Sequence, residues 1–170
     1  MTEKSYKQVF GFFERHPLLK KLLMIIYTIL PAIVMLCYPV LAVVLFILFL
    51  NGRVEPQTLI RTIIVPAVTF VSLSIVRRFL NAPRPYEVYN YTPLLPRDKK
   101  GESFPSRHSA SVFIIAMVYL YINVPTGIVF LVLGVLMAAS RVLAGVHFIK
   151  DVIAGALYSI ILGYLGLFIF

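Results

Sequence analysis

The chain has 170 residues, 60% of them hydrophobic and only 14% charged, and its mean hydropathy is +0.91. These values exclude an ordinary soluble domain and indicate an all-α membrane helical bundle, built as one domain over residues 1–170. Because a membrane helix needs about 20 apolar residues, we expect about six transmembrane helices. The net charge of +9 indicates membrane lipids and an anionic lipid substrate as partners, rather than nucleic acid.

The N-terminal part begins with a charged segment over 1–21, which we expect to be cytoplasmic. The run over 22–50 carries no charge and contains two prolines, and it is long for one span and short for two. We predict an N-terminal helical hairpin over 22–58 that turns near Cys37, with a single long span as the alternative. Cys37 is the only cysteine, so no intramolecular disulfide can form.

Residues 59–170 are expected to form the catalytic core of the bundle. A polar, Pro-rich stretch over 81–105 interrupts the apolar pattern and carries tyrosines that suit a membrane interface. The apolar runs before and after it predict four further spans, over about 59–80, 107–122, 126–142 and 148–170.

Ionisable and hydroxyl side chains gather at the ends of these spans in three clusters. The clusters are Arg77 with Arg84, then Ser106 with Arg107 and His108, and finally Arg141 with His147 and Asp151. Two spans separate the second cluster from the third, and one loop joins the first to the second. All three clusters therefore reach the same face of the membrane, where we expect one polar pocket.

His147 and Asp151 have the spacing i, i+4, which places both side chains on one side of a helix. A carboxylate beside an imidazole fixes the imidazole tautomer and makes the other ring nitrogen a better nucleophile or base. An Asp in a first helical turn can equally cap its own helix. The spacing alone leaves both interpretations open.

The arginines and the start of the fourth predicted span have features that suit a phosphate. Guanidinium groups bind phosphate oxygens in a planar, bidentate manner, and the free N–H groups at a helix N-terminus also bind phosphate. Each arginine taken alone could instead reach lipid headgroups, and Ser106 could be only an N-cap. Three arginines that converge with two of the chain's three histidines favour a phosphate-binding pocket.

Three segments, in chain order, resemble the signature motifs of the type-2 phosphatidic acid phosphatase family, the lipid phosphate phosphatases. RRFLNAPRP over 77–85 is similar to KxxxxxxRP, PSRH over 105–108 is similar to PSGH, and SRVLAGVHFIKD over 140–151 matches SRxxxxxHxxxD. Members of this family share a pocket with vanadium haloperoxidases, so the resemblance implies the same core helix bundle.

The resemblance also implies a role for each residue of the pocket. His147 would attack phosphorus and become phosphohistidine, Asp151 would orient it, and His108 would protonate the leaving oxygen. The phosphate would be held by Arg77, Arg84, Ser106, Arg107 and Arg141. No cofactor and no metal are implied, because the arginines supply the positive charge.

Two positions depart from the family motifs. Arg77 stands where the family has Lys, which keeps the charge but changes the shape presented to a phosphate. Arg107 stands where the family has Gly. We expect its backbone N–H to face the phosphate, and its side chain to reach a second anionic group or the lipid headgroups. Both departures bear on substrate preference more than on reaction type.

The sequence therefore predicts a metal-independent lipid phosphatase of the cell membrane. The substrates we expect are phosphatidylglycerophosphate, phosphatidate or a polyprenyl (di)phosphate. A lipid phosphotransferase that uses the same pocket, and a non-enzymatic lipid-binding or lipid-moving protein, are the alternatives. With the predicted hairpin and a cytoplasmic N-terminus, the pocket faces the extracytoplasmic side, whereas a single span over 22–50 inverts that face.

Overall fold

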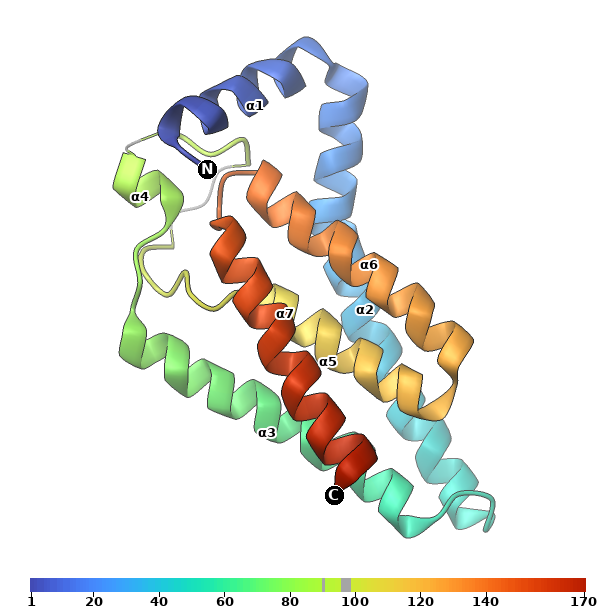
Figure 1. Cartoon of the computed structure of the whole chain (residues 1–170). Helices are drawn as coiled ribbons and strands as arrows, with labels where there is room; N and C mark the ends of the chain where they lie inside the picture. The colour runs from blue at the N-terminus through green and yellow to red at the C-terminus, as the bar shows by residue number, and fades with distance from the viewer. Residues whose placement is uncertain (90, 96–98) are drawn as a thin grey trace.

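The structure is a computed structural model that describes residues 1–89, 91–95 and 99–170. The described residues form helices and connecting loops, and the predicted all-α membrane bundle is confirmed (Figure 1). The helices are α1 (Glu3–Arg15), α2 (Pro17–Leu50), α3 (Pro56–Leu80), α4 (Pro85–Tyr89), α5 (Arg107–Ile122), α6 (Val124–Leu143), α7 (Ile149–Tyr164) and a terminal π-helix η1 (Leu165–Ile169).

The centre of the bundle is α5, which packs against α6, α7 and α3. Its residues from Ser109 to Val118 are all buried, because neighbouring helices surround it on every side. The close approach depends on glycines: a Cβ on Gly127 would lie 2.4 Å from the backbone of Leu120, and one on Gly163 would lie 2.9 Å from Met117. Small residues at such positions let membrane helices pack tightly.

The lipid-facing helices surround this centre. By length and composition, α2, α3, α6 and the stretch from α7 through η1 can each cross a membrane, and α5 is a shorter apolar helix. The predicted spans over 107–122 and 126–142 agree with α5 and α6 to within two residues. The start of α5 is set by Ser106, whose side chain accepts from the N–H of Ser109 as an N-cap.

The predicted hairpin over 22–58 is wrong. Residues 17–50 form one continuous helix, α2, with Pro31 and Pro39 inside it. At 1.5 Å per residue its 34 residues are about 51 Å long, so it extends beyond the hydrocarbon core. A hairpin turn within lipid would leave backbone groups without partners, whereas a proline in a membrane helix is tolerated. The hairpin had supplied two of the six predicted spans, and α2 replaces these two with one.

The N-terminal segment forms α1, an amphipathic helix that lies across one end of the bundle (Figure 1). Its buried residues are Tyr6 and Phe10, and the Tyr6 hydroxyl donates to the backbone carbonyl of His147. The N-terminus and the third motif therefore lie at the same end. The extracytoplasmic side was predicted for the pocket by counting the hairpin as two spans, and with α2 as a single helix that count no longer supports it.

Candidate active site

The third motif places His147 in the loop between α6 and α7, and Asp151 in the first turn of α7. Both side chains are buried. Asp151 Oδ2 lies 3.4 Å from His147 Nδ1 and also accepts from the backbone N–H of Phe148 at 3.0 Å. The carboxylate therefore caps its own helix and contacts the imidazole at once. The geometry fits both interpretations of this spacing, and the catalytic role of the pair stays a prediction.

Ser103 completes this group and was not predicted from the sequence. Its hydroxyl donates to Asp151 Oδ2 at 2.5 Å, and its oxygen lies 3.3 Å from His147 Nδ1. Because the single hydroxyl proton goes to the carboxylate, the serine oxygen is an acceptor toward the imidazole. We infer that Nδ1 carries the proton, which leaves the lone pair on Nε2.

The electrostatic environment keeps His147 neutral. Burial, opposed by the hydrogen bond to Asp151 and assisted by the charges of Arg84 and Arg77, lowers the pKa of His147 from 6.5 to about 4. The imidazole is thus unprotonated at neutral pH, as a nucleophile or base requires.

A hydrogen bond between backbone groups joins the second motif to the third. The N–H of Ser106 donates to the carbonyl of Asp151 at 2.8 Å. Gly155, one turn further along α7, permits this approach, because a Cβ there would lie 2.4 Å from the carbonyl oxygen of Ser106. The N-terminus of α5 therefore meets the N-terminus of α7, and His108 lies in the first turn of α5, partly buried.

The first motif supplies two buried arginines. The Arg77 guanidinium donates to the carbonyls of Glu102 and Pro105, and Arg84 donates to Gly101 at 3.0 Å and to Val146 at 3.3 Å. These carbonyls are neutral acceptors, so they fix the guanidinium groups without cancelling their charge. Both arginines contact segments that carry the other two motifs, and the three motifs interlock.

Arg141 and Arg107 have different surroundings. The buried Arg141 guanidinium lies 3.9 Å from the centroid of the Tyr27 ring and donates to the Tyr27 carbonyl at 3.0 Å, so it contacts α2. Arg107 is exposed, and its guanidinium lies 5.9 Å from the centroid of the Phe70 ring on α3. The roles predicted for both residues in phosphate binding stay predictions, as do those of the other pocket residues.

An apolar groove of about 380 Å³ opens on the lipid-facing side of the same region, between α2, α3 and α5. Its lining includes Phe70, which faces Arg107, and Ser111, which lies one helical turn beyond Arg107. The groove therefore begins near the polar cluster and continues into the hydrophobic part of the bundle.

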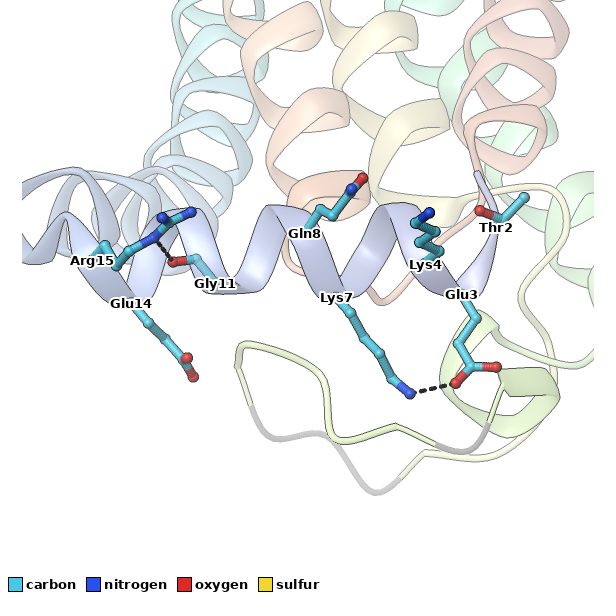
Figure 2. A pocket seen from close by; sticks show the side chains of 8 residues that line it. All are labelled: Thr2, Glu3, Lys4, Lys7, Gln8, Gly11, Glu14 and Arg15. Carbon is cyan, nitrogen blue, oxygen red and sulfur yellow. Dashed lines mark hydrogen bonds and ion pairs between the residues drawn. The ribbon is translucent and has the colours of Figure 1, made fainter.

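A larger hollow, of about 860 Å³, lies on the outer face of α1 and is lined only by residues between Thr2 and Arg15. Figure 2 shows Glu3, Lys7 and Glu14 pointing away from the bundle, with Lys7 paired to Glu3 at 2.5 Å. None of its lining residues belongs to the three motifs. It is the solvated face of an interfacial helix.

The fold and the three interlocked motifs define a membrane-embedded helical protein with a buried cluster of His, Asp and Arg side chains at one end. The PAP2 superfamily model matches residues 58–169 of the chain, so the chain belongs to this superfamily. The family resemblance carried by the three motifs is confirmed.

Three relatives show how far the similarity extends. Undecaprenyl-diphosphatase BcrC of Bacillus subtilis (strain 168) is 31% identical over 83 residues, which cover 49% of this chain and 42% of BcrC. The match thus spans less than half the length of that curated relative. The crystal structure of Aquifex aeolicus LpxE is 28% identical, with a TM-score of 0.67, and the alignment covers 96% of this chain and 93% of LpxE.

The third relative supports the fold alone. It is a transmembrane PAP2-type phosphatidylglycerolphosphate phosphatase from Bacillus subtilis, 23% identical with a TM-score of 0.71. The alignment covers 96% of this chain and 81% of that structure.

Proposed function

We propose that this protein dephosphorylates a membrane lipid phosphate, without a metal, through a phosphohistidine intermediate. The observation that carries the proposal is the buried group of His147, Asp151 and Ser103, in contact with the segments held by Arg77 and Arg84. A binding protein has no need of an imidazole kept neutral by its surroundings and oriented by a carboxylate.

The reaction proceeds in two displacements. His147 Nε2 attacks phosphorus while the bond from phosphorus to the lipid oxygen breaks, and His108 gives that oxygen a proton. A water, deprotonated by His108, then attacks the phosphohistidine and releases inorganic phosphate with free His147. The arginines stabilise the charge on the phosphoryl oxygens in both steps, which is why we propose no metal.

The hydrocarbon part of the substrate lies in the groove between α2, α3 and α5. A lipid whose phosphate reaches His147 must keep its tail in apolar surroundings, and this groove begins beside Arg107 and Phe70. Ala67 lines the groove and is exposed, so Ala67→Trp fills the space without disturbing the core. We expect KM for a long-chain lipid phosphate to rise about tenfold, with KM for a short-chain soluble phosphate ester unchanged.

A matched control for the groove is Val132→Trp, at an exposed position on α6 away from the groove. It should leave KM unchanged for both substrates. Equal effects of Ala67→Trp on the long and the short substrate would show that the tail lies elsewhere.

Candidate substrates are phosphatidylglycerophosphate, phosphatidate and polyprenyl mono- or diphosphate. The similarity to BcrC, an undecaprenyl-diphosphatase, supports a polyprenyl diphosphate, and phosphatidylglycerophosphate is the substrate class of a Bacillus subtilis phosphatase with the same fold. Purified protein should release phosphate from at least one of these lipids in the presence of EDTA, and vanadate should inhibit it. Loss of activity in EDTA with rescue by Mg²⁺ would contradict the metal-independent reaction.

The N-terminus and the active site share one side of the membrane in this proposal. If the active site is extracytoplasmic, the N-terminus must be extracytoplasmic too. The positive charges of the N-terminal segment favour the cytoplasm instead. In a Cys37→Ala background, Thr2→Cys and Lys99→Cys should react alike with an impermeant thiol reagent, and Arg53→Cys, between α2 and α3, should react from the opposite side. Opposite behaviour of Thr2→Cys and Lys99→Cys would contradict the shared side.

A further inference from the structure

The loop that carries His147 is held by side chains from three separate segments. The carbonyl of Gly145 accepts from the Tyr91 hydroxyl at 2.9 Å, that of Val146 accepts from Arg84 at 3.3 Å, and that of His147 accepts from Tyr6 at 3.0 Å. Three consecutive carbonyls outside any helix thus each have a side-chain donor. Tyr6 is the contribution of α1, 141 residues away in sequence.

The contact with Tyr6 is made on the peptide unit between His147 and Phe148. The carbonyl of this unit accepts from Tyr6, and its N–H donates to Asp151 Oδ2 at 3.0 Å. Because a peptide unit is planar, a donor on one edge and an acceptor on the other fix its orientation. The same carboxylate oxygen lies beside the imidazole of His147, so the orientation of this unit determines how ring and carboxylate meet.

The surroundings of Tyr6 suit a fixed donor. Its side chain is fully buried, and its ring lies 5.3 Å from that of Tyr91 and 6.3 Å from that of Tyr89, centroid to centroid. Phe10, one turn later in α1, packs against Gly145, where a Cβ would lie 2.5 Å from the Phe10 ring. Burial and the charge of Asp151 raise the pKa of the Tyr6 phenol above its ordinary value, so the hydroxyl keeps its proton.

We propose that Tyr6 is a positioning residue for the nucleophile: through the carbonyl of His147, α1 holds the imidazole in line with the phosphate. Tyr6 does not touch the substrate, and the inference rests on the phosphatase activity proposed above. The N-terminal helix α1 then supplies a side chain that the active site requires, and it also contacts the membrane surface.

The test is Tyr6→Phe, which keeps the ring and removes only the donor. We expect kcat for a lipid phosphate to fall about tenfold while KM changes by less than about twofold, because the arginines that bind phosphate are untouched. The matched control is Tyr89→Phe, in the same aromatic cluster, whose hydroxyl donates to the Met1 carbonyl at 3.3 Å and not to the nucleophile loop. It should keep the kcat of the wild type.

Three outcomes are possible when thermal stability is measured beside the kinetics. A loss of kcat in Tyr6→Phe alone, with folding retained, supports the proposal. A wild-type kcat in Tyr6→Phe, or an equal loss in both variants that follows their thermal stability, overturns it. Failure of the proposed function is separate, because the wild-type protein itself would then release no phosphate from any of the lipids.

Discussion

The C-terminal core and the N-terminal helices are built in different ways. In α5, ten consecutive residues are buried, whereas α2 buries only four of its 34 residues. Glycines bring α5, α6 and α7 together, while α2 contains no glycine and presents Leu, Ile and Val to lipid. Tight packing is therefore concentrated in the helices that carry the second and third motifs. The N-terminal helices supply a groove wall and a few specific contacts.

This difference predicts that a Gly→Ala substitution has a large effect in the core and a small effect in α1. Gly155→Ala puts a Cβ 2.4 Å from the Ser106 carbonyl, so α5 and α7 must move apart. Overpacking of this kind costs up to about 3 kcal/mol, and we expect kcat/KM to fall about 100-fold. Gly11→Ala in α1 has no atom within 4 Å of the new Cβ and should leave kcat/KM within about twofold. The measurement is kcat/KM for phosphate release by the two purified variants. Similar losses in both would show that the core and α1 do not differ in how tightly they pack.

A smaller effect is expected within the core itself, at Ser103. Ser103→Ala removes the donor to Asp151 Oδ2 and the acceptor beside His147 Nδ1, without adding volume. A hydrogen bond to a charged group contributes about 1.5–3 kcal/mol, and part of this is retained through the Phe148 N–H. We expect kcat to fall about 10- to 30-fold with KM unchanged. Steady-state kinetics would contradict the role of Ser103 if KM changed and kcat did not.

The smallest expected effect is a shift in pH dependence. Protonated His147 cannot attack phosphorus, so activity is lost as pH falls through its pKa, which lies near 4 and below the ordinary 6.5. The charge of Arg84 helps to lower that pKa. In Arg84→Gln the pKa rises, and the acid limb of kcat/KM should move to higher pH by less than about one unit.

The control for the pH profile is Arg78→Gln, at an exposed position next to the buried Arg77. It should leave the acid limb where it is in the wild type, measured with the same substrate. An acid limb that moves equally in both variants, or moves to lower pH in Arg84→Gln, would contradict this electrostatic account.

The features of the fold that could be predicted from the sequence are those marked by a few neighbouring residues. Pro105 and Ser106 mark the start of α5, and the four-residue spacing brings His147, just before α7, next to Asp151 in the first turn of α7. Counting spans from α5 onward was enough to bring these motifs to one face. The hairpin prediction failed because Pro31 and Pro39 indicate a turn in water but are accommodated inside a membrane helix.

Tertiary contacts account for what the sequence could not provide. Ser103 is one serine in a polar stretch, and only the fold places it against Asp151. Tyr6 lies in a segment that its charges mark as a solvated tail, yet the pattern of Tyr6 and Phe10, four residues apart, was a signal for a helix with one apolar face. Arg141 was grouped with the other arginines by the motif, and the structure places its guanidinium against Tyr27.

In the proposed reaction, His147 carries the phosphoryl group during turnover. The direct measurement is to mix the purified protein with a lipid phosphate labelled in its phosphoryl group, quench within the first turnovers at alkaline pH, and locate the label by peptide mass spectrometry. We predict an acid-labile phosphohistidine at His147 in the wild type and none in His147→Ala, whose activity is several powers of ten lower. Label on another residue, or a His147→Ala variant that keeps most of its activity, would contradict the account.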